Sequence, residues 1–202
     1  MQLHQQILSE IEVSHGPAEM LGRFFLKAVS AANARGVRLR FGTFDELSEV
    51  NRQNAKVWRP LVPTFDSQTS YLVPENAFCL LGEDLKGDVV ASSAAKIFDW
   101  TSSNLNAEAS SLRIFYADPT AALARNEQCR MSTPSAATIS GHVLHTGAVW
   151  YRPDYRGRGL VAIMPRFARA YAAAKWTFDT VVSLQPQIRV RGSGSRAVFD
   201  AF

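Results

Sequence analysis

One stretch of the sequence, residues 147–176, limits the fold more than any other. It reads as a strand, a lead-in turn that contains Pro153, a second turn with the sequence Arg-Gly-Arg-Gly at 156–159, and a long amphipathic helix. A glycine turn between a strand and a helix leaves several backbone N–H groups without partners, and these donors attract an anion, most often a phosphate. Glycine lets the backbone approach that anion because it has no Cβ atom. The stretch therefore predicts an α/β chain with an anion-binding turn.

Composition narrows the class of protein. A chain of 202 residues with 47% hydrophobic and 20% charged residues fits one compact domain, with or without an appendage. The N-terminus lacks a signal-peptide pattern and no apolar run approaches the length of a membrane span, so we expect a cytoplasmic protein without a membrane partner. Cys79 and Cys129 lie far apart without metal-ligand spacing, which favours free thiols and predicts no metal site. The net charge of +4 suits an anionic ligand.

The first third of the chain predicts helices around one strand. Residues 1–36 read as a helical extension that covers a sheet or a dimer face, so a homodimer is one expectation. Residues 37–202 form the second predicted unit, and its first segment, VRLRF at 37–41, alternates as a strand does. Thr43, with a glutamate three residues later, is typical of a capping box. We expect the helix that it opens to continue toward Trp58.

The middle of the chain reads as a hairpin followed by an insert. Residues 77–83 and 88–100 predict the two hairpin strands, with a tight turn between them. In the insert we expect a polar loop at 101–109, a strand at 112–116 and a short helix at 119–131.

A long extended stretch, residues 137–152, leads into the basic turn. Position parity predicts two sets of side chains on opposite faces of this strand: Val143, His145, Gly147, Val149 and Tyr151 on one, and His142, Leu144, Thr146, Ala148 and Trp150 on the other. Gly147 is the candidate position for a bulge in this strand. The next helix is expected to begin at Leu160, with Pro165 as a bend inside it.

The segment PDYRGRGL resembles the acyl-CoA signature of the GCN5-related N-acetyltransferases, which is Gln/Arg-x-x-Gly-x-Gly/Ala between the fourth strand and the following helix. Arg156 takes the first position and Gly159 that of the first glycine. Val161 stands where the pattern has Gly or Ala, which is a departure.

This resemblance implies an α/β (α+β) fold with a mixed, mostly antiparallel sheet flanked by helices. It also implies acetyl-CoA as the cofactor, with its pyrophosphate on the turn amides and its pantetheine arm along the preceding strand. A bulge in that strand would open the cleft for the arm. The residues that it assigns to cofactor binding are Val149, Trp150, Tyr151, Arg156, Gly157, Arg158, Gly159, Leu160 and Val161.

The last part of the chain departs further from the family pattern. We expect a fifth strand at 177–184, a loop rich in glycine and arginine at 186–195, and a short helix at 196–202. Two further strands normally follow such a helix in the family, but this sequence stops at Phe202. The C-terminal strand pair is therefore expected to be incomplete. Either a neighbouring chain or another element completes the sheet, or this chain is a shortened product.

Acetyl transfer to an amine requires a base for the acceptor ammonium and a proton for the leaving thiolate. His145 is the candidate base because it lies on the strand that leads to the cofactor and its side chain titrates near neutral pH. Asp99, Glu108 and His142 are alternatives. The family often places a tyrosine on the helix after the fifth strand, where Phe199 falls here. Tyr151, Tyr155 or solvent would then supply the proton.

The predicted function is an acyl-CoA-dependent N-acetyltransferase that acts on a primary amine. Its acceptor pocket would include Trp58, Arg59 and Phe65, because in the family the helix after the first strand and the following loop often form a wall of that pocket. The alternative is a catalytically silent CoA-binding regulatory or interaction domain. A nucleic-acid binder is disfavoured, because its arginines would fall in two separate turns rather than on one continuous face: Arg156 and Arg158 in one, Arg189, Arg191 and Arg196 in the other.

Overall fold

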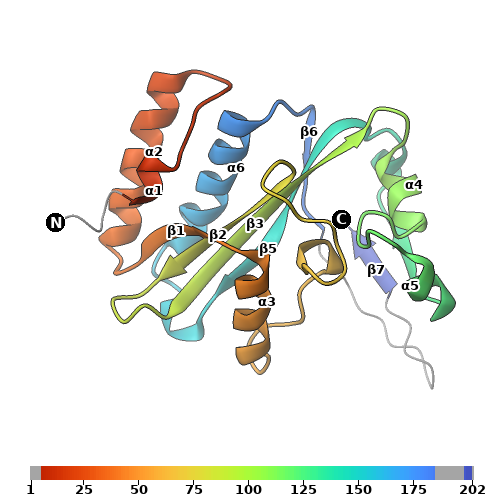
Figure 1. The fold of residues 1–202 in the computed structure, drawn as a ribbon, viewed down its shortest axis with the longest axis horizontal. Helices are drawn as coiled ribbons and strands as arrows, with labels where there is room; N and C mark the ends of the chain where they lie inside the picture. Colours follow the sequence, from red (N-terminus) through yellow and green to blue (C-terminus); the bar gives the residue numbers. More distant parts are fainter. Residues whose placement is uncertain (1–5, 185–197, 202) are drawn as a thin grey trace.

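The computed structural model describes residues 6–184 and 198–201. Its centre is a five-stranded sheet with the strand order β1-β2-β3-β5-β6 (Figure 1). The strands are β1 (Arg38–Gly42), β2 (Ala77–Glu83), β3 (Val89–Trp100), β5 (Gly141–Tyr151) and β6 (Thr180–Val182). β1, β2, β3 and β5 pair antiparallel, and β6 lies parallel to β5. The predicted mixed, mostly antiparallel sheet is therefore confirmed.

Helices cover both faces of the sheet, and alternate residues of β2 show which helix covers which face. Leu80 packs in one core cluster with residues of α2 (Ala18–Asn33) and of α6 (Met164–Lys175). Its neighbour Leu81 packs in another cluster with Leu47 of α3 (Phe44–Gln53). The short helix α1 (Gln6–Ser9) joins the α2 side through Ile7.

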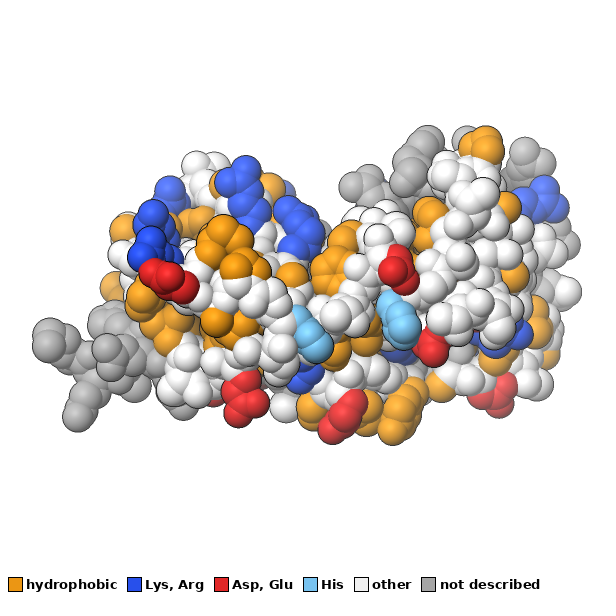
Figure 2. All heavy atoms as spheres, turned by 90° about the horizontal axis from the view of Figure 1, so that it is seen from above, with side chains coloured by type: hydrophobic (Ala, Val, Ile, Leu, Met, Phe, Trp, Pro, Cys, Tyr) orange, Lys and Arg blue, Asp and Glu red, His pale blue; other side chains and the backbone are white. Residues whose placement is uncertain are grey.

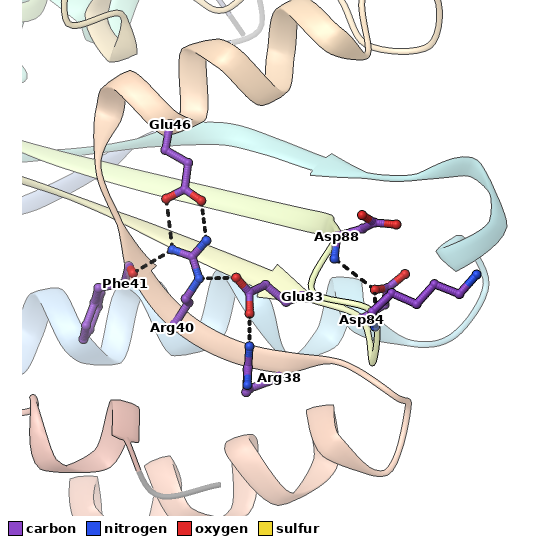
Figure 3. A network of polar contacts seen from close by, with 8 residues as sticks. Arg38, Arg40, Phe41, Glu46, Glu83, Asp84 and Asp88 are labelled. Atoms are coloured by element: carbon purple, nitrogen blue, oxygen red, sulfur yellow. Dashed lines mark hydrogen bonds and ion pairs between the residues drawn. The ribbon is translucent and has the colours of Figure 1, made fainter. Parts of the chain in front are cut away.

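The segment between β1 and β2 keeps the predicted helix start. The Thr43 hydroxyl accepts a hydrogen bond from the Glu46 N–H at 3.1 Å. The Glu46 carboxylate does not complete a capping box, because it accepts hydrogen bonds from Arg40. Arg40 also donates to Glu83, which in turn pairs with Arg38, so this network joins β1, α3 and β2 (Figure 3). The helix ends at Gln53, well before the predicted Trp58.

The insert after β3 differs from its prediction. It holds α4 (Leu105–Ser110), α5 (Thr120–Ala124) and β4 (Gln128–Met131), so the loop at 101–109 is partly helical and the helix at 119–131 gives way to a strand. The strand predicted at 112–116 is wrong, because this segment forms turns. Leu112 has a φ of 63°, and it packs with Ile114 and Phe115 in a separate core cluster. These side chains are apolar because they fill that cluster rather than one face of a sheet.

The end of the chain also requires a correction. Residues Val198–Ala201 form β7, which pairs parallel with β4, so the predicted helix at 196–202 is wrong over these residues. The predicted loop at 186–195, with Arg189 and Arg191, and residue Arg196 lie outside the described residues. The predicted strand at 177–184 is shortened to β6.

The helix after β5 begins later than predicted. A 3-10 helix, η4 (Leu160–Ala162), follows the turn, and α6 begins at Met164. Pro165 therefore lies in the first turn of α6, where a missing N–H removes no helical hydrogen bond. The predicted bend inside the helix is wrong for this reason. None of the helices in the described ranges is long and apolar enough to span a bilayer.

Candidate functional site

The candidate site begins at a bulge in β5. Gly147 pairs with Ala94, but Trp150 pairs with Ser92, so β5 has one more residue than β3 across this interval. Ala148 takes up the extra length with a φ of 49°. The Ser92 hydroxyl donates a hydrogen bond to the Ala148 carbonyl at 2.6 Å, which fixes the bulge from the side of β3.

The bulge changes which side chains share a face. His145 lies on the α3 side beside Phe65, with ring centroids 5.0 Å apart, and Trp150 lies on that side too, stacked on Trp58. Tyr151 instead packs against the core cluster that contains α2. The parity prediction that joined His145 and Tyr151 is therefore wrong beyond Gly147, because one extra residue reverses the alternation.

The outer edge of β5 is open beyond the bulge. β6 pairs with β5 only at Val143, Leu144 and His145, and it ends at Val182. No strand in the described part of the chain pairs with this edge of β5 from Gly147 to Tyr151. From above, a hollow separates the part of the molecule that carries α2 and α6 from the part that carries α4 and α5 (Figure 2).

The turn after β5, residues 156–161, is here called the glycine turn. Gly157 and Gly159 both have a φ of 77°, a left-handed conformation that glycine adopts without strain. Five consecutive N–H groups, from Gly157 to Val161, have no acceptor among the described residues. A Cβ atom added at Gly157 would meet nothing within 4 Å, so this side of the turn is open. Such a row of donors fits an anionic group.

Two exposed arginines flank these donors. Arg156 Nε donates to the Tyr151 carbonyl at 3.1 Å, and its Nη2 donates to the Val57 carbonyl at 3.4 Å. The Arg158 guanidinium lies 4.0 Å from the centre of the Tyr155 ring, and its Nε donates to the Asp154 carbonyl at 3.1 Å. Neither arginine forms an ion pair with a carboxylate within the described residues, although the charge of Arg158 acts on the nearby Asp154. Arg152, by contrast, pairs with Asp84, Asp88 and Asp154.

The β5 side chains predicted to bind the cofactor have different surroundings. Val149 is 45% exposed, whereas Trp150 is buried. The Trp150 Nε1 and the Tyr151 hydroxyl are buried and have no hydrogen-bond partner within the described residues. Burial raises the pKa of Tyr151 to about 12, so its hydroxyl keeps its proton at neutral pH. In the glycine turn, Val161 is 67% exposed and Leu160 is buried in the core.

His145 lies in a closed environment. It is 1% exposed, and its Nδ1 has no partner in the described part of the chain. Burial, and then the charge of Lys96, lower its pKa to about 3, so the ring is neutral at pH 7. Lys96 is its cross-strand neighbour on β3 and donates a hydrogen bond to the Ser70 hydroxyl at 2.6 Å.

Lys96 is a residue that sequence reasoning missed. Burial lowers its pKa to about 8, so a fraction of its amine is neutral at physiological pH. No carboxylate pairs with it within the described ranges, and its Nζ lies 5.0 Å from the Phe98 ring centre. The available signal was a single lysine directly after a run of small and apolar residues in β3, VVASSAAKIFDW.

The three alternative candidates for the base lie away from the glycine turn. Asp99 and His142 form a cross-strand pair at the far end of β3 and β5, and Glu108 is bound by Arg113 and Ser103. The structure brings Trp58 and Phe65 to the α3 side of β5. The Arg59 carbonyl accepts a hydrogen bond from Asn51 at 2.8 Å, and Tyr155 is buried beneath Arg158.

No sequence model of a protein family and no curated protein matches this chain. Several solved structures are similar to it. A glucosamine-6-phosphate N-acetyltransferase from Arabidopsis thaliana is 11% identical, with a TM-score of 0.40 over 73% of this chain and 80% of that one. A predicted acetyltransferase from Clostridium acetobutylicum, solved with acetyl-CoA, is 10% identical, with a TM-score of 0.40 over 74% and 80% of the two chains.

A GCN5-related N-acetyltransferase from Ralstonia eutropha is 16% identical, with a TM-score of 0.39 over 73% of this chain and 82% of that one. These proteins are described as acetyltransferases, the family that the turn sequence resembles. At these identities and scores, the likeness says nothing about the activity of this chain.

Proposed function

We propose that the chain is an acyl-CoA-dependent N-acyltransferase that transfers an acetyl group from acetyl-CoA to a primary amine. The observation that carries this proposal is the row of five N–H groups from Gly157 to Val161, which have no acceptor among the described residues and lie in the turn after a strand whose outer edge is open. The row suits a pyrophosphate, and the open edge suits an extended amide-containing arm that pairs as a strand does.

The residues present fit this ligand. Turn amides would hold phosphate oxygens, and the positive charges of Arg156 and Arg158 would add to their attraction. Val149, Trp150 and Tyr151 would lie beside the arm through their backbone. When bound, acetyl-CoA supplies an activated acetyl thioester.

Proton transfer is assigned to residues of β5 and β3. His145 is proposed as the base, with Lys96 beside it as the group whose pKa of about 8 lies closer to neutral pH. A base with a pKa near the working pH is the more effective proton acceptor, which favours the pair over His145 alone. Tyr151 is proposed as the proton donor, because its hydroxyl is protonated and has no acceptor among the described residues.

Calorimetric titration with acetyl-CoA tests the cofactor site. The wild-type protein should bind, and Gly157→Glu should abolish binding because it places a carboxylate beside the free N–H groups. Gly87→Glu is the matched control, since Gly87 has a φ of 88° and an equally open side in the β2–β3 turn. No heat with wild-type protein, or equal binding by both variants, would contradict the proposal.

A thiol-release assay against a panel of primary amines tests the transfer itself. Release of CoA that depends on the amine supports an enzyme. A catalytically silent CoA-binding domain is the second candidate, and the closed environment of His145 favours it. Binding without release for every amine in the panel would support that second reading.

A further inference from the structure

Arg35 joins the N-terminal helix α2 to the glycine turn. Its Nε donates a hydrogen bond to the Arg158 carbonyl at 2.8 Å, across 123 residues of sequence. Its Nη1 donates to the Ala31 carbonyl in the last turn of α2 at 2.6 Å. The guanidinium is therefore fixed at one end to a helix and at the other to the turn.

The contact determines how one peptide group of the turn is oriented. In a trans peptide the C=O and the N–H point in opposite directions, and no cis peptide occurs in the described ranges. The Arg158 carbonyl and the Gly159 N–H belong to the same peptide. Because Arg35 holds the carbonyl toward α2, the Gly159 N–H points away from α2, as one of the five free donors.

The helix that precedes Arg35 is packed into the core. Phe25 and Ala32 of α2 are buried in one cluster with Leu160 of the turn and Phe167 of α6. Gly159 leaves room for the guanidinium, since an added Cβ atom would lie 3.3 Å from Arg35 Nε. No carboxylate pairs with Arg35 in the part of the chain that the structure describes, so its charge also acts on the turn.

We propose that Arg35 is a positioning residue of the anion site: it holds the peptide between Arg158 and Gly159 so that the Gly159 N–H stays available to the ligand. The inference rests on the proposed function for the identity of the ligand, but not for the orientation of the peptide. It assigns a functional contact to the N-terminal helix, which the sequence predicts only to cover a sheet or a dimer face.

Three variants separate positioning from charge. Arg35→Ala removes both the donor and the charge. Arg35→Gln removes the charge but keeps a donor, because Gln Nε2 and Arg Nε are the same number of bonds from the backbone. Arg23→Ala is the control on α2, the helix that Arg35 follows, since Arg23 is exposed, pairs only with Glu19 among the described residues, and carries the same charge.

The first measurement is ¹⁵N relaxation of the turn amides in the ligand-free protein. Arg35→Ala should lower the order parameters of Gly159 and Leu160, whereas Arg35→Gln and Arg23→Ala should leave them near wild-type values. Unchanged order parameters in Arg35→Ala, with an intact melting transition, would overturn the inference. The relaxation measurement needs no ligand, so it decides the role of Arg35 even if the proposed function fails.

The second measurement is calorimetric titration with CoA. Arg35→Ala should raise the Kd about tenfold, the effect of losing one oriented hydrogen bond to a charged group. Arg35→Gln should raise it about threefold or less. Equal losses in the two variants would show that Arg35 acts through its charge, which contradicts positioning. Absence of CoA binding by the wild-type protein would count against the proposed function alone.

Discussion

Trp58 and Trp150 stack with their ring centroids 4.7 Å apart and their planes 7° from parallel. Trp58 belongs to the loop after α3, and Trp150 lies on β5 just beyond the bulge. Arg156 makes a second contact to the same loop through the Val57 carbonyl. The loop after α3 is therefore coupled to both the strand and the turn of the candidate site.

Trp58→Ala should weaken both the fold and the site. It removes a large, partly buried ring, so we expect a loss of about 2 kcal/mol in the free energy of unfolding, below the range for fully buried aromatic residues. Its loop also anchors Arg156, so CoA affinity should fall severalfold. Urea unfolding and calorimetry measure the two effects. Trp58→Phe, which keeps a stacking ring, should restore most of both; equal losses in the two variants would contradict a role for stacking.

Gly147→Ala should be destabilising because an added Cβ atom would collide with the edge of the Phe65 ring. Overpacking of this kind costs about 1–3 kcal/mol. The double variant Gly147→Ala with Phe65→Leu should recover part of that loss, and a double-mutant cycle on thermal melts measures the coupling. Additive effects would show that Phe65 is not the cause.

The buried His145 should make stability fall in mild acid. Its folded pKa of about 3 lies below the unfolded value, so between these pKa values the unfolded state takes up a proton that the folded state does not. Stability is therefore lost as the pH falls below about 6.5, by about 2 kcal/mol at pH 5 from this residue.

Chemical unfolding of wild type and His145→Asn at pH 7 and pH 5 measures this effect, and the variant should lose this part of the pH dependence. Lys96, the neighbour of His145, has a pKa of about 8 and is mostly protonated at pH 7 and fully so at pH 5, so its own charge changes little over this range. His142→Asn, an exposed histidine on the same strand, is the control and should keep the wild-type slope. The same slope in all three proteins would contradict burial of a neutral His145.

Glu83 holds the network that joins β1, β2 and α3 (Figure 3). Burial opposes ionisation of this carboxylate, but hydrogen bonds from Arg38 and Arg40 outweigh it and lower its pKa. A lowered pKa means that the stabilisation is present above the unfolded value and is lost as the pH falls through the folded one.

Glu83→Gln should therefore cost about 1–2 kcal/mol at pH 7, because the arginines are partly exposed and partly screened. The difference from wild type should shrink below pH 4. Unfolding curves at pH 7 and pH 3.5 test this expectation, and a constant difference would contradict it.

The sequence by itself determined the features that depend on neighbouring residues. The hairpin strands follow from two strand-like runs around a tight turn, and the Thr43 cap follows from capping chemistry. Predictions from local patterns were wrong where contacts with distant segments determined the structure. Leu112, Ile114 and Phe115 fill a separate core cluster, and residues Val198–Ala201 form a strand because β4 pairs with them.

Only the tertiary structure decided how the site is assembled. Alternation along β5 cannot reveal which face Tyr151 takes, because one bulge residue reverses every position after it. The burial that lowers the pKa values of His145 and Lys96 comes from elements far away in sequence, as does the contact of Arg35 with the Arg158 carbonyl. A sequence pattern records local preference, whereas burial and long-range hydrogen bonds depend on how distant segments pack.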